Sequence, residues 1–220
     1  MQKVSENDEI IIYYKEKGEH TLPSSDYTKD DSLFIYRLDK VTSGLLVQAK
    51  NEDIYQKLKE VQKMNLVIKT YEAIARKDIS DNFTDSHIKA SIEQQGSIET
   101  MIDENKSFTI ESYFRPYGKG RKCVKAVSAD ELKKYKDKDV TTRLYTTNII
   151  SSKRTDDGNV IFTVEIRNGF RHQIRSHLAS IGYPILGDTL YGGIIPEGKE
   201  EVYKKGIALE CVTVEIPGDL

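Results

Sequence analysis

Strand patterns in this chain outnumber helix patterns, and the two kinds do not alternate regularly. A regular alternation would indicate a parallel sheet covered by helices on both faces, so its absence favours a different layout. The sequence therefore predicts an α+β fold, with a mixed, mainly antiparallel sheet and flanking helices. Strands are expected at residues 8–15, 32–36, 44–50, 66–76, 96–102, 107–114 and 159–167, with a final strand pair in 206–216.

A helix is predicted for residues 51–63. Asn51 is suited to cap it, and Ile54, Leu58 and Val61 recur at helical spacing. The charged segment 128–139 is expected to form a short surface helix.

The composition sets limits on function. With 220 residues, 31% of them charged, the chain suits one globular domain with a real core. It has no apolar run long enough to span a membrane and no signal-peptide pattern at its start. The two cysteines have no spacing typical of metal ligands or disulfides, so we expect reduced thiols in a cytoplasmic protein. The net charge of −2 means that any nucleic-acid contact must rest on local basic patches.

A single carboxylate, Asp39, lies in a polar turn between two apolar segments, with Arg37 and Lys40 on either side. The common explanation for such an aspartate is a turn in which the side chain binds its own backbone. The alternative is a chemical role, and this second interpretation gains weight from a second stretch of the chain.

That stretch, residues 167–177, reads "RNGFRHQIRSH" and contains cations and histidines but no acid. It lies where a predicted strand ends and a helix begins, and helix starts favour anions. A solvated helix face is the simplest interpretation. However, Arg175 lies beside the apolar stripe of that helix, and a part-buried arginine needs an acid, for which Asp39 is a candidate. His172 and His177 lack the spacing and the further ligands of a metal site.

The middle of the chain, residues 115–127, is basic and contains glycine. Either it forms a solvated hairpin loop, or its cations contact phosphates. The strand–loop–helix context of a nucleotide-binding loop is missing. Its candidate phosphate ligands are Arg115, Lys119, Arg121 and Lys122.

Three blocks in order resemble the RluA-type pseudouridine synthases: "RLDKVTSGLLVQAK", "KTY" at 69–71, and "HQIRSHLASIGYPILGDTLYGG". The resemblance covers roughly residues 32–216. It implies a mixed sheet split by a central catalytic cleft and the isomerisation of uridine to pseudouridine in ribosomal or transfer RNA. No cofactor and no metal are implied. We expect one catalytic domain over residues 1–220, without an accessory RNA-binding domain, acting as a monomer.

The same resemblance assigns roles to residues. Asp39 would be the catalytic nucleophile and Arg175 its partner, while Tyr71 would pack on the flipped base and Arg37 would hold the nucleotide out of its stack. A cation beside the acid would keep it ionised for attack on the ribose. The expected RNA contacts are Arg37, Arg171, His172, Arg115, Lys119, Arg121 and Lys122.

The chain departs from the family pattern at four positions. Tyr36 replaces a histidine, Glu16 a proline, Phe170 an arginine and Arg171 a small residue. These changes leave two alternatives to the synthase. One is an inactive RNA-binding relative with the same fold. The other is a retaining glycosidase, which the lack of a second placed carboxylate disfavours.

Overall fold

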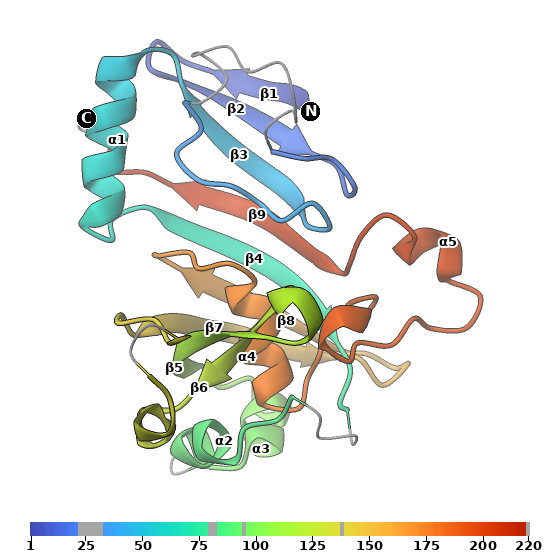
Figure 1. The fold of residues 1–220 in the computed structure, drawn as a ribbon. Coiled ribbons are helices and arrows are strands. Elements are labelled where there is room, and N and C mark those ends of the chain that lie inside the picture. The colour runs from blue at the N-terminus through green and yellow to red at the C-terminus, as the bar shows by residue number, and fades with distance from the viewer. Residues whose placement is uncertain (22–32, 79–82, 94–95, 137–138, 219–220) are drawn as a thin grey trace.

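The computed structural model describes residues 1–21, 33–78, 83–93, 96–136 and 139–218. Its strands form a nine-stranded sheet in the order β1-β2-β3-β9-β4-β8-β7-β5-β6 (Figure 1). All neighbouring strands are antiparallel except β3 and β9, so the predicted mixed, mainly antiparallel α+β fold is confirmed. The strands are β1 (Gln2–Glu6), β2 (Ile10–Lys15), β3 (Ser43–Ala49), β4 (Ile68–Ala75), β5 (Phe108–Tyr117), β6 (Cys123–Val127), β7 (Tyr145–Arg154), β8 (Val160–Ile166) and β9 (Leu209–Glu215).

Helices cover the two halves of the sheet separately. Helix α1 packs on β3 in one half, whereas α2, α3 and α4 pack on β5, β6 and β7 in the other (Figure 1). The α-helices are α1 (Glu52–Lys63), α2 (Ser86–Glu93), α3 (Ile98–Asp103), α4 (Gln173–Ser180) and α5 (Glu200–Tyr203). The 3-10 turns used below are η2 (Lys119–Arg121), η3 (Ala129–Lys134) and η5 (Thr189–Tyr191).

The halves meet at the short parallel contact between β3 and β9, where Ser43 pairs with Glu210 and Gly44 with Cys211. Gly44 has φ of +121°, and a Cβ atom there would lie 2.3 Å from the Cys211 carbonyl oxygen. Only glycine therefore allows the two backbones to approach this closely.

Local patterns explain most of the regular elements. In β8 the buried residues alternate from Val160 to Ile166, as predicted. In α1 the Asn51 side chain accepts a hydrogen bond from the Ile54 amide, which confirms the predicted cap, and Leu58 is fully buried.

The predicted strand at 96–102 was wrong, because this segment forms α3. The Ser97 side chain caps the helix by accepting from the Thr100 amide. Ile98, Met101 and Ile102 are all buried on one face, a helical spacing that a short apolar run conceals.

The segment 32–36 is not a strand within its described part; Ser32 lies outside the described residues. Phe34 forms only an isolated bridge with Gln48, since the chain leaves the edge of β3 to enter the Asp39 turn. Residues 206–216 contain one strand, β9, instead of a pair. The surface helix expected at 128–139 is the shorter 3-10 turn η3, and residues 137–138 lie outside the described residues.

The basic segment 115–127 forms a hairpin, as the first of its two interpretations expected. It consists of the end of β5, a tip at η2 and the strand β6.

Candidate active site

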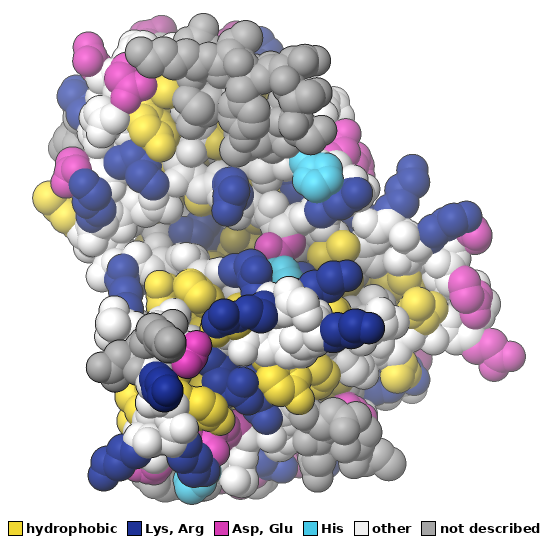
Figure 2. Space-filling model, in the orientation of Figure 1, with side chains coloured by type: hydrophobic (Ala, Val, Ile, Leu, Met, Phe, Trp, Pro, Cys, Tyr) yellow, Lys and Arg dark blue, Asp and Glu magenta, His cyan; other side chains and the backbone are white. Residues whose placement is uncertain are grey.

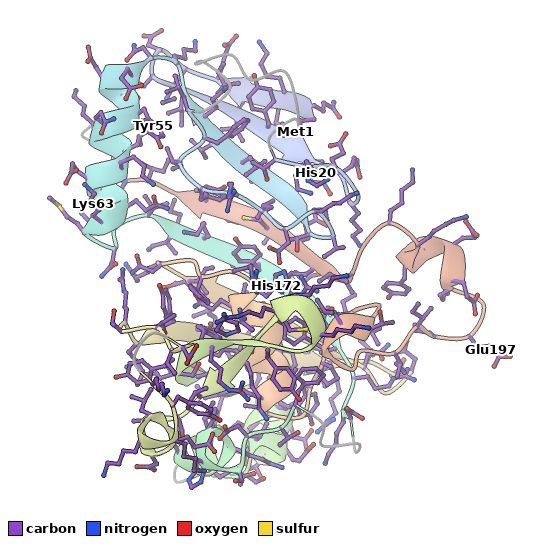
Figure 3. The ribbon with its side chains drawn as sticks, viewed as in Figure 1. Met1, His20, Tyr55, Lys63, His172 and Glu197 are labelled. Carbon is purple, nitrogen blue, oxygen red and sulfur yellow. The ribbon has the colours of Figure 1, made fainter. Side chains whose placement is uncertain are left out.

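A cavity of about 970 Å³ opens between the two halves of the sheet. Figure 2 shows a hollowed band across this face, with Lys and Arg side chains on both sides. In Figure 3, His172 lies near the middle of the molecule, while Tyr55 and Lys63 on α1 and His20 lie above it; all four line the cavity.

The charge of the cavity lining is strongly one-sided. Among the described lining residues, seven carry a cationic side chain and one carries a carboxylate, Asp39. The cations are Arg37, Lys59, Lys63, Lys69, Arg143, Arg171 and Arg175. A net charge of −2 for the chain therefore coexists with a cavity suited to a polyanion.

The turn that carries Asp39 is fixed from several sides. Before it, the Leu38 amide donates to the Thr21 hydroxyl at 3.1 Å. After it, the Lys40 carbonyl accepts from the Gly18 amide at 2.8 Å and from the buried Lys15 ammonium at 3.3 Å. Such anchoring holds a reactive side chain in one place, which a solvated turn does not need.

Arg175 connects Asp39 to a second, buried acid. Its Nη1 lies 3.1 Å from Asp39 Oδ2, so the expected ion pair is present. Its Nε and Nη2 form a bidentate pair with Asp188 at 2.7 and 2.8 Å. Burial raises the pKa of Asp188, while the Arg175 guanidinium opposes this. Asp188 therefore orients the guanidinium, and Arg175 presents its remaining edge to Asp39.

Tyr71 lies on β4 in the cavity wall and is 5% exposed. Burial raises the pKa of its phenol well above the ordinary value, and Cys211 and Asp39 add to this. The hydroxyl is therefore a neutral phenol at neutral pH.

His172 precedes α4 in a left-handed conformation, with φ of +56°. Its Nδ1 is 3.1 Å from the Tyr191 hydroxyl, and its Nε2 is 3.8 Å from Asp39 Oδ2, beyond hydrogen-bond reach. Burial lowers the pKa of His172 to about 4. Asp39 opposes this shift and the charges of Arg175 and Arg171 add to it, so the ring is neutral at neutral pH.

Phe170, at the position of a family arginine, forms an aromatic part of the cavity wall. Its ring stacks on Phe114 with centroids 5.1 Å apart and an interplanar angle of 11°. Tyr145 packs beside it at 5.0 Å. The chain thus replaces a charge with an apolar surface of fixed orientation.

The other predicted RNA contacts lie at different places relative to the cavity. Arg37 is exposed at the cavity rim. The Arg171 Nη2 donates to the backbone carbonyls of Arg121 and Cys123, so it ties the hairpin tip to the cavity wall. Lys119 and Lys122 are exposed at that tip, outside the cavity lining.

Arg115 lies apart from the cavity, although the sequence grouped it with the hairpin tip. Its guanidinium sits 5.1 Å from the Tyr117 ring centroid and 4.8 Å from that of Tyr135. These rings hold it within the hairpin instead of presenting it to a ligand.

Sequence reasoning missed three residues of the site: Asp188, Tyr191 and Lys69. The "GD" and "YG" of the third block contain the first two, and "KTY" begins with the third. Their placement beside Arg175, His172 and Tyr36 depends on contacts across the fold that no spacing reveals.

Within the described residues, no group of three or more His, Cys, Asp or Glu side chains is arranged to hold a metal ion. In the same part of the chain, no helix has the length and apolar character needed to cross a membrane.

Comparison with known proteins adds a family match. The family model described as RNA pseudouridylate synthase matches residues 9–180. The tRNA pseudouridine(31) synthase of Saccharomyces cerevisiae is 27% identical over 204 residues, which cover 86% of this chain and 45% of that protein. The ribosomal large subunit pseudouridine synthase D of Buchnera aphidicola is 30% identical over 160 residues, covering 73% and 39%. The chain thus spans less than half the length of these two relatives.

The fold has a solved counterpart. The structure titled human RNA pseudouridylate synthase domain containing 1 superimposes with a TM-score of 0.63, covering 99% of this chain and 79% of that one. At 20% identity, this likeness concerns the fold alone.

Proposed function

This chain belongs to the RNA pseudouridylate synthase family, and on that premise we propose that it isomerises uridine to pseudouridine in a structured RNA. The observation that carries the proposal is Asp39, the single carboxylate among the described residues of the cavity lining, held 3.1 Å from Arg175 among cationic side chains.

The reaction has three stages in this site. The RNA nucleotide first leaves its stack and enters the cavity, as any enzyme acting on a base inside a folded RNA requires. Asp39 then attacks the ribose, or assists the loss of a ribose proton, while the glycosidic bond breaks. The uracil turns and rejoins the ribose through carbon. Tyr71 packs on the base throughout.

One acid suffices for this chemistry. A hydrolytic glycosidase uses two carboxylates, one to protonate the leaving group and one as base or nucleophile. Asp39 is the only carboxylate in the described cavity lining, which disfavours a glycosidase. In the isomerisation, uracil departs as an anion and is recaptured before it diffuses away, so the cavity must retain the base.

The substrate we propose is a transfer or ribosomal RNA. The named relatives act on RNAs of these two kinds, and the lining cations match a phosphate backbone. We further propose that the chain acts as a single catalytic domain without a metal or cofactor. The inactive alternative is disfavoured because Asp39, Arg175 and Tyr71 are all retained around one cavity.

The test is a comparison of cellular RNA. Pseudouridines are mapped in cells that lack the gene and in cells that carry the parent protein, Asp39→Asn or Asp156→Asn. Asp156 is an exposed acid in the turn between β7 and β8, so it serves as a matched control. We expect the parent and the control to restore the same site and Asp39→Asn to restore none. A site that Asp39→Asn restores fully would overturn the assigned chemistry.

A further inference from the structure

Lys69 is a buried cation without an acidic partner in the described part of the chain. It is 2% exposed, yet it lines the cavity. Its Nζ donates to the Arg167 carbonyl at 3.3 Å and lies 5.2 Å from the centroid of the Tyr36 ring. A buried ammonium with so few partners costs free energy, which an anion in the cavity would offset.

The position of Lys69 indicates which anion its ammonium would bind. Lys69 and Tyr71 are two residues apart on β4, so their side chains point to the same face about 7 Å apart. In the proposed reaction Tyr71 packs on the base, which places Lys69 beside the base as well. The phosphates of the RNA belong at the solvent-exposed rim, where Arg37 and Lys63 lie.

The Tyr36 ring that the Lys69 ammonium contacts is fixed in place. The Tyr36 hydroxyl donates to the Leu45 carbonyl at 2.8 Å, so its ring cannot swing away. Tyr36 is also a departure from the family pattern, which has histidine there. A tyrosine ring attracts the ammonium without neutralising it, and so leaves its charge available to a ligand.

We propose that the Lys69 ammonium donates a hydrogen bond to a carbonyl oxygen of the departing uracil and stabilises the leaving group as an anion. This inference rests on the proposed function. A fixed hydrogen-bond donor close to the atom on which charge develops is the kind of group that lowers a barrier most.

The step balances without any further reactant. The bond between N1 and C1′ breaks, and its electron pair remains on the uracil, which becomes an anion. C1′ gains a bond to the Asp39 carboxylate, or C2′ loses a proton to it. Later the uracil C5 bonds to C1′ as the bond between C1′ and Asp39 breaks, or as Asp39 returns the proton to C2′, so the carboxylate is regenerated. The C5 hydrogen then leaves as a proton and N1 accepts one. Lys69 keeps its protons throughout.

The charge of Lys69 should also affect how the reaction rate depends on pH. Burial lowers the pKa of Lys69 to about 8, and the charge of Lys59 on α1 reinforces the shift. The pKa values of Cys211, at about 12, and of Tyr36 and Tyr71, raised by burial, keep those neighbours uncharged at pH 8. The contribution of Lys69 is therefore present below pH 8 and lost as the pH rises through it.

Lys15, which binds the Asp39 turn, also has a pKa lowered by burial to about 8. An alkaline loss of rate in the parent protein does not by itself identify Lys69. The variant Lys69→Arg separates the two, because arginine stays charged at every pH that the RNA tolerates. Its rate should fall less than that of the parent above pH 8.

The test uses single-turnover kinetics on the RNA that gains pseudouridine in the mapping above. We expect Lys69→Met to slow nucleotide conversion by roughly a hundredfold, as removing a single oxyanion donor does. Its RNA affinity should stay within a few-fold. Lys69→Arg should recover part of the rate. Lys153→Met, at an exposed cation at the end of β7 and outside the cavity lining, should leave affinity and rate unchanged.

A second substrate tests the leaving-group role directly. RNA with 5-fluorouridine at the target carries a better leaving group, because fluorine stabilises the uracil anion. The deficit of Lys69→Met, measured as consumption of the target nucleotide, should shrink on this RNA.

Three results would overturn the inference. An unchanged rate in Lys69→Met, with the parent active, would remove Lys69 from the reaction. Weakened binding with a smaller salt dependence and an unchanged rate would make Lys69 a phosphate contact. A parent protein that converts no uridine would overturn the proposed function and this inference together.

Discussion

At the scale of single residues, the difference between Asp39 and an ordinary turn aspartate lies in its neighbours. Thr21 holds the backbone of the residue before it, and Gly18 and Lys15 hold that of the residue after it. Its carboxylate contacts a guanidinium that Asp188 orients. A turn residue that only binds its own backbone needs none of this.

Tyr71→Phe should slow the last chemical step more than the first. The ring still packs on the base, but the hydroxyl can no longer relay the C5 proton. Because burial keeps the Tyr71 phenol protonated, a relay that accepts one proton while donating another fits better than a phenolate base. Single-turnover assays with uridine tritiated at C5 should show delayed tritium release and near-normal RNA binding. Release at the parent rate would leave Tyr71 as a packing residue only.

At the scale of elements, α4 is unusual because all eight of its residues are buried. Its start brings His172 and Arg175 to the cavity, and its other side packs on β6 and β7. The interpretation of this segment as a solvated helix face is therefore wrong, and the part-buried arginine that was weighed against it is present.

Arg175→Met should cost about 3–5 kcal/mol of unfolding free energy, because it leaves Asp188, 1% exposed, without its partner. The double variant Arg175→Met with Asp188→Asn should recover part of this stability, because the buried charge is then gone. Urea unfolding of both variants measures the difference. Activity should be lost in both, since neither presents a cation to Asp39. Fully additive stability losses would mean that the two residues act independently.

The tip of the β5–β6 hairpin lies beside the cavity. Lys119 and Arg121 are exposed there, and Arg171 ties the tip to the cavity wall. Lys119→Ala with Arg121→Ala should weaken RNA binding and reduce the slope of log affinity against log salt by up to about two. Lys153→Ala, an exposed cation at the end of β7, is the control and should leave that slope unchanged. Equal slopes in all three proteins would show that the tip cations are merely solvated.

At the scale of the whole molecule, the cavity exists because two halves of one sheet join at β3 and β9. The join lies next to the chemistry: β3 follows the Asp39 turn, and Leu209 at the start of β9 lines the cavity. A change at the join should therefore affect stability and activity together.

Gly44→Ala should destabilise the protein by about 2–3 kcal/mol more than Gly158→Ala. Both glycines have positive φ, so both variants share a backbone cost, but only Gly44 has a carbonyl oxygen where the Cβ would lie. Urea unfolding compares the two variants, and a pseudouridine assay should show a larger loss for Gly44→Ala. Equal stabilities would mean that the sheet separates slightly at the join without cost.

The sequence by itself determined the fold class, the family and the main candidates for chemistry. Alternation and caps are local properties, so β8 and α1 could be predicted from spacing alone. The apolar run at 96–102 could not, because a short run suits a strand and a helix equally until Ser97 supplies the cap.

Tertiary structure alone decided how those candidates are arranged. It gave Arg175 two acids, of which the sequence indicated one, and it placed Arg115 between two tyrosine rings, away from the cavity. It also buried Lys69 beside Tyr36, with no acidic partner among the residues that the structure describes. The physical reason is that burial and pairing depend on residues far apart in the chain: Asp39 and Arg175 are 136 positions apart, and only the folded sheet sets the distance between their side chains.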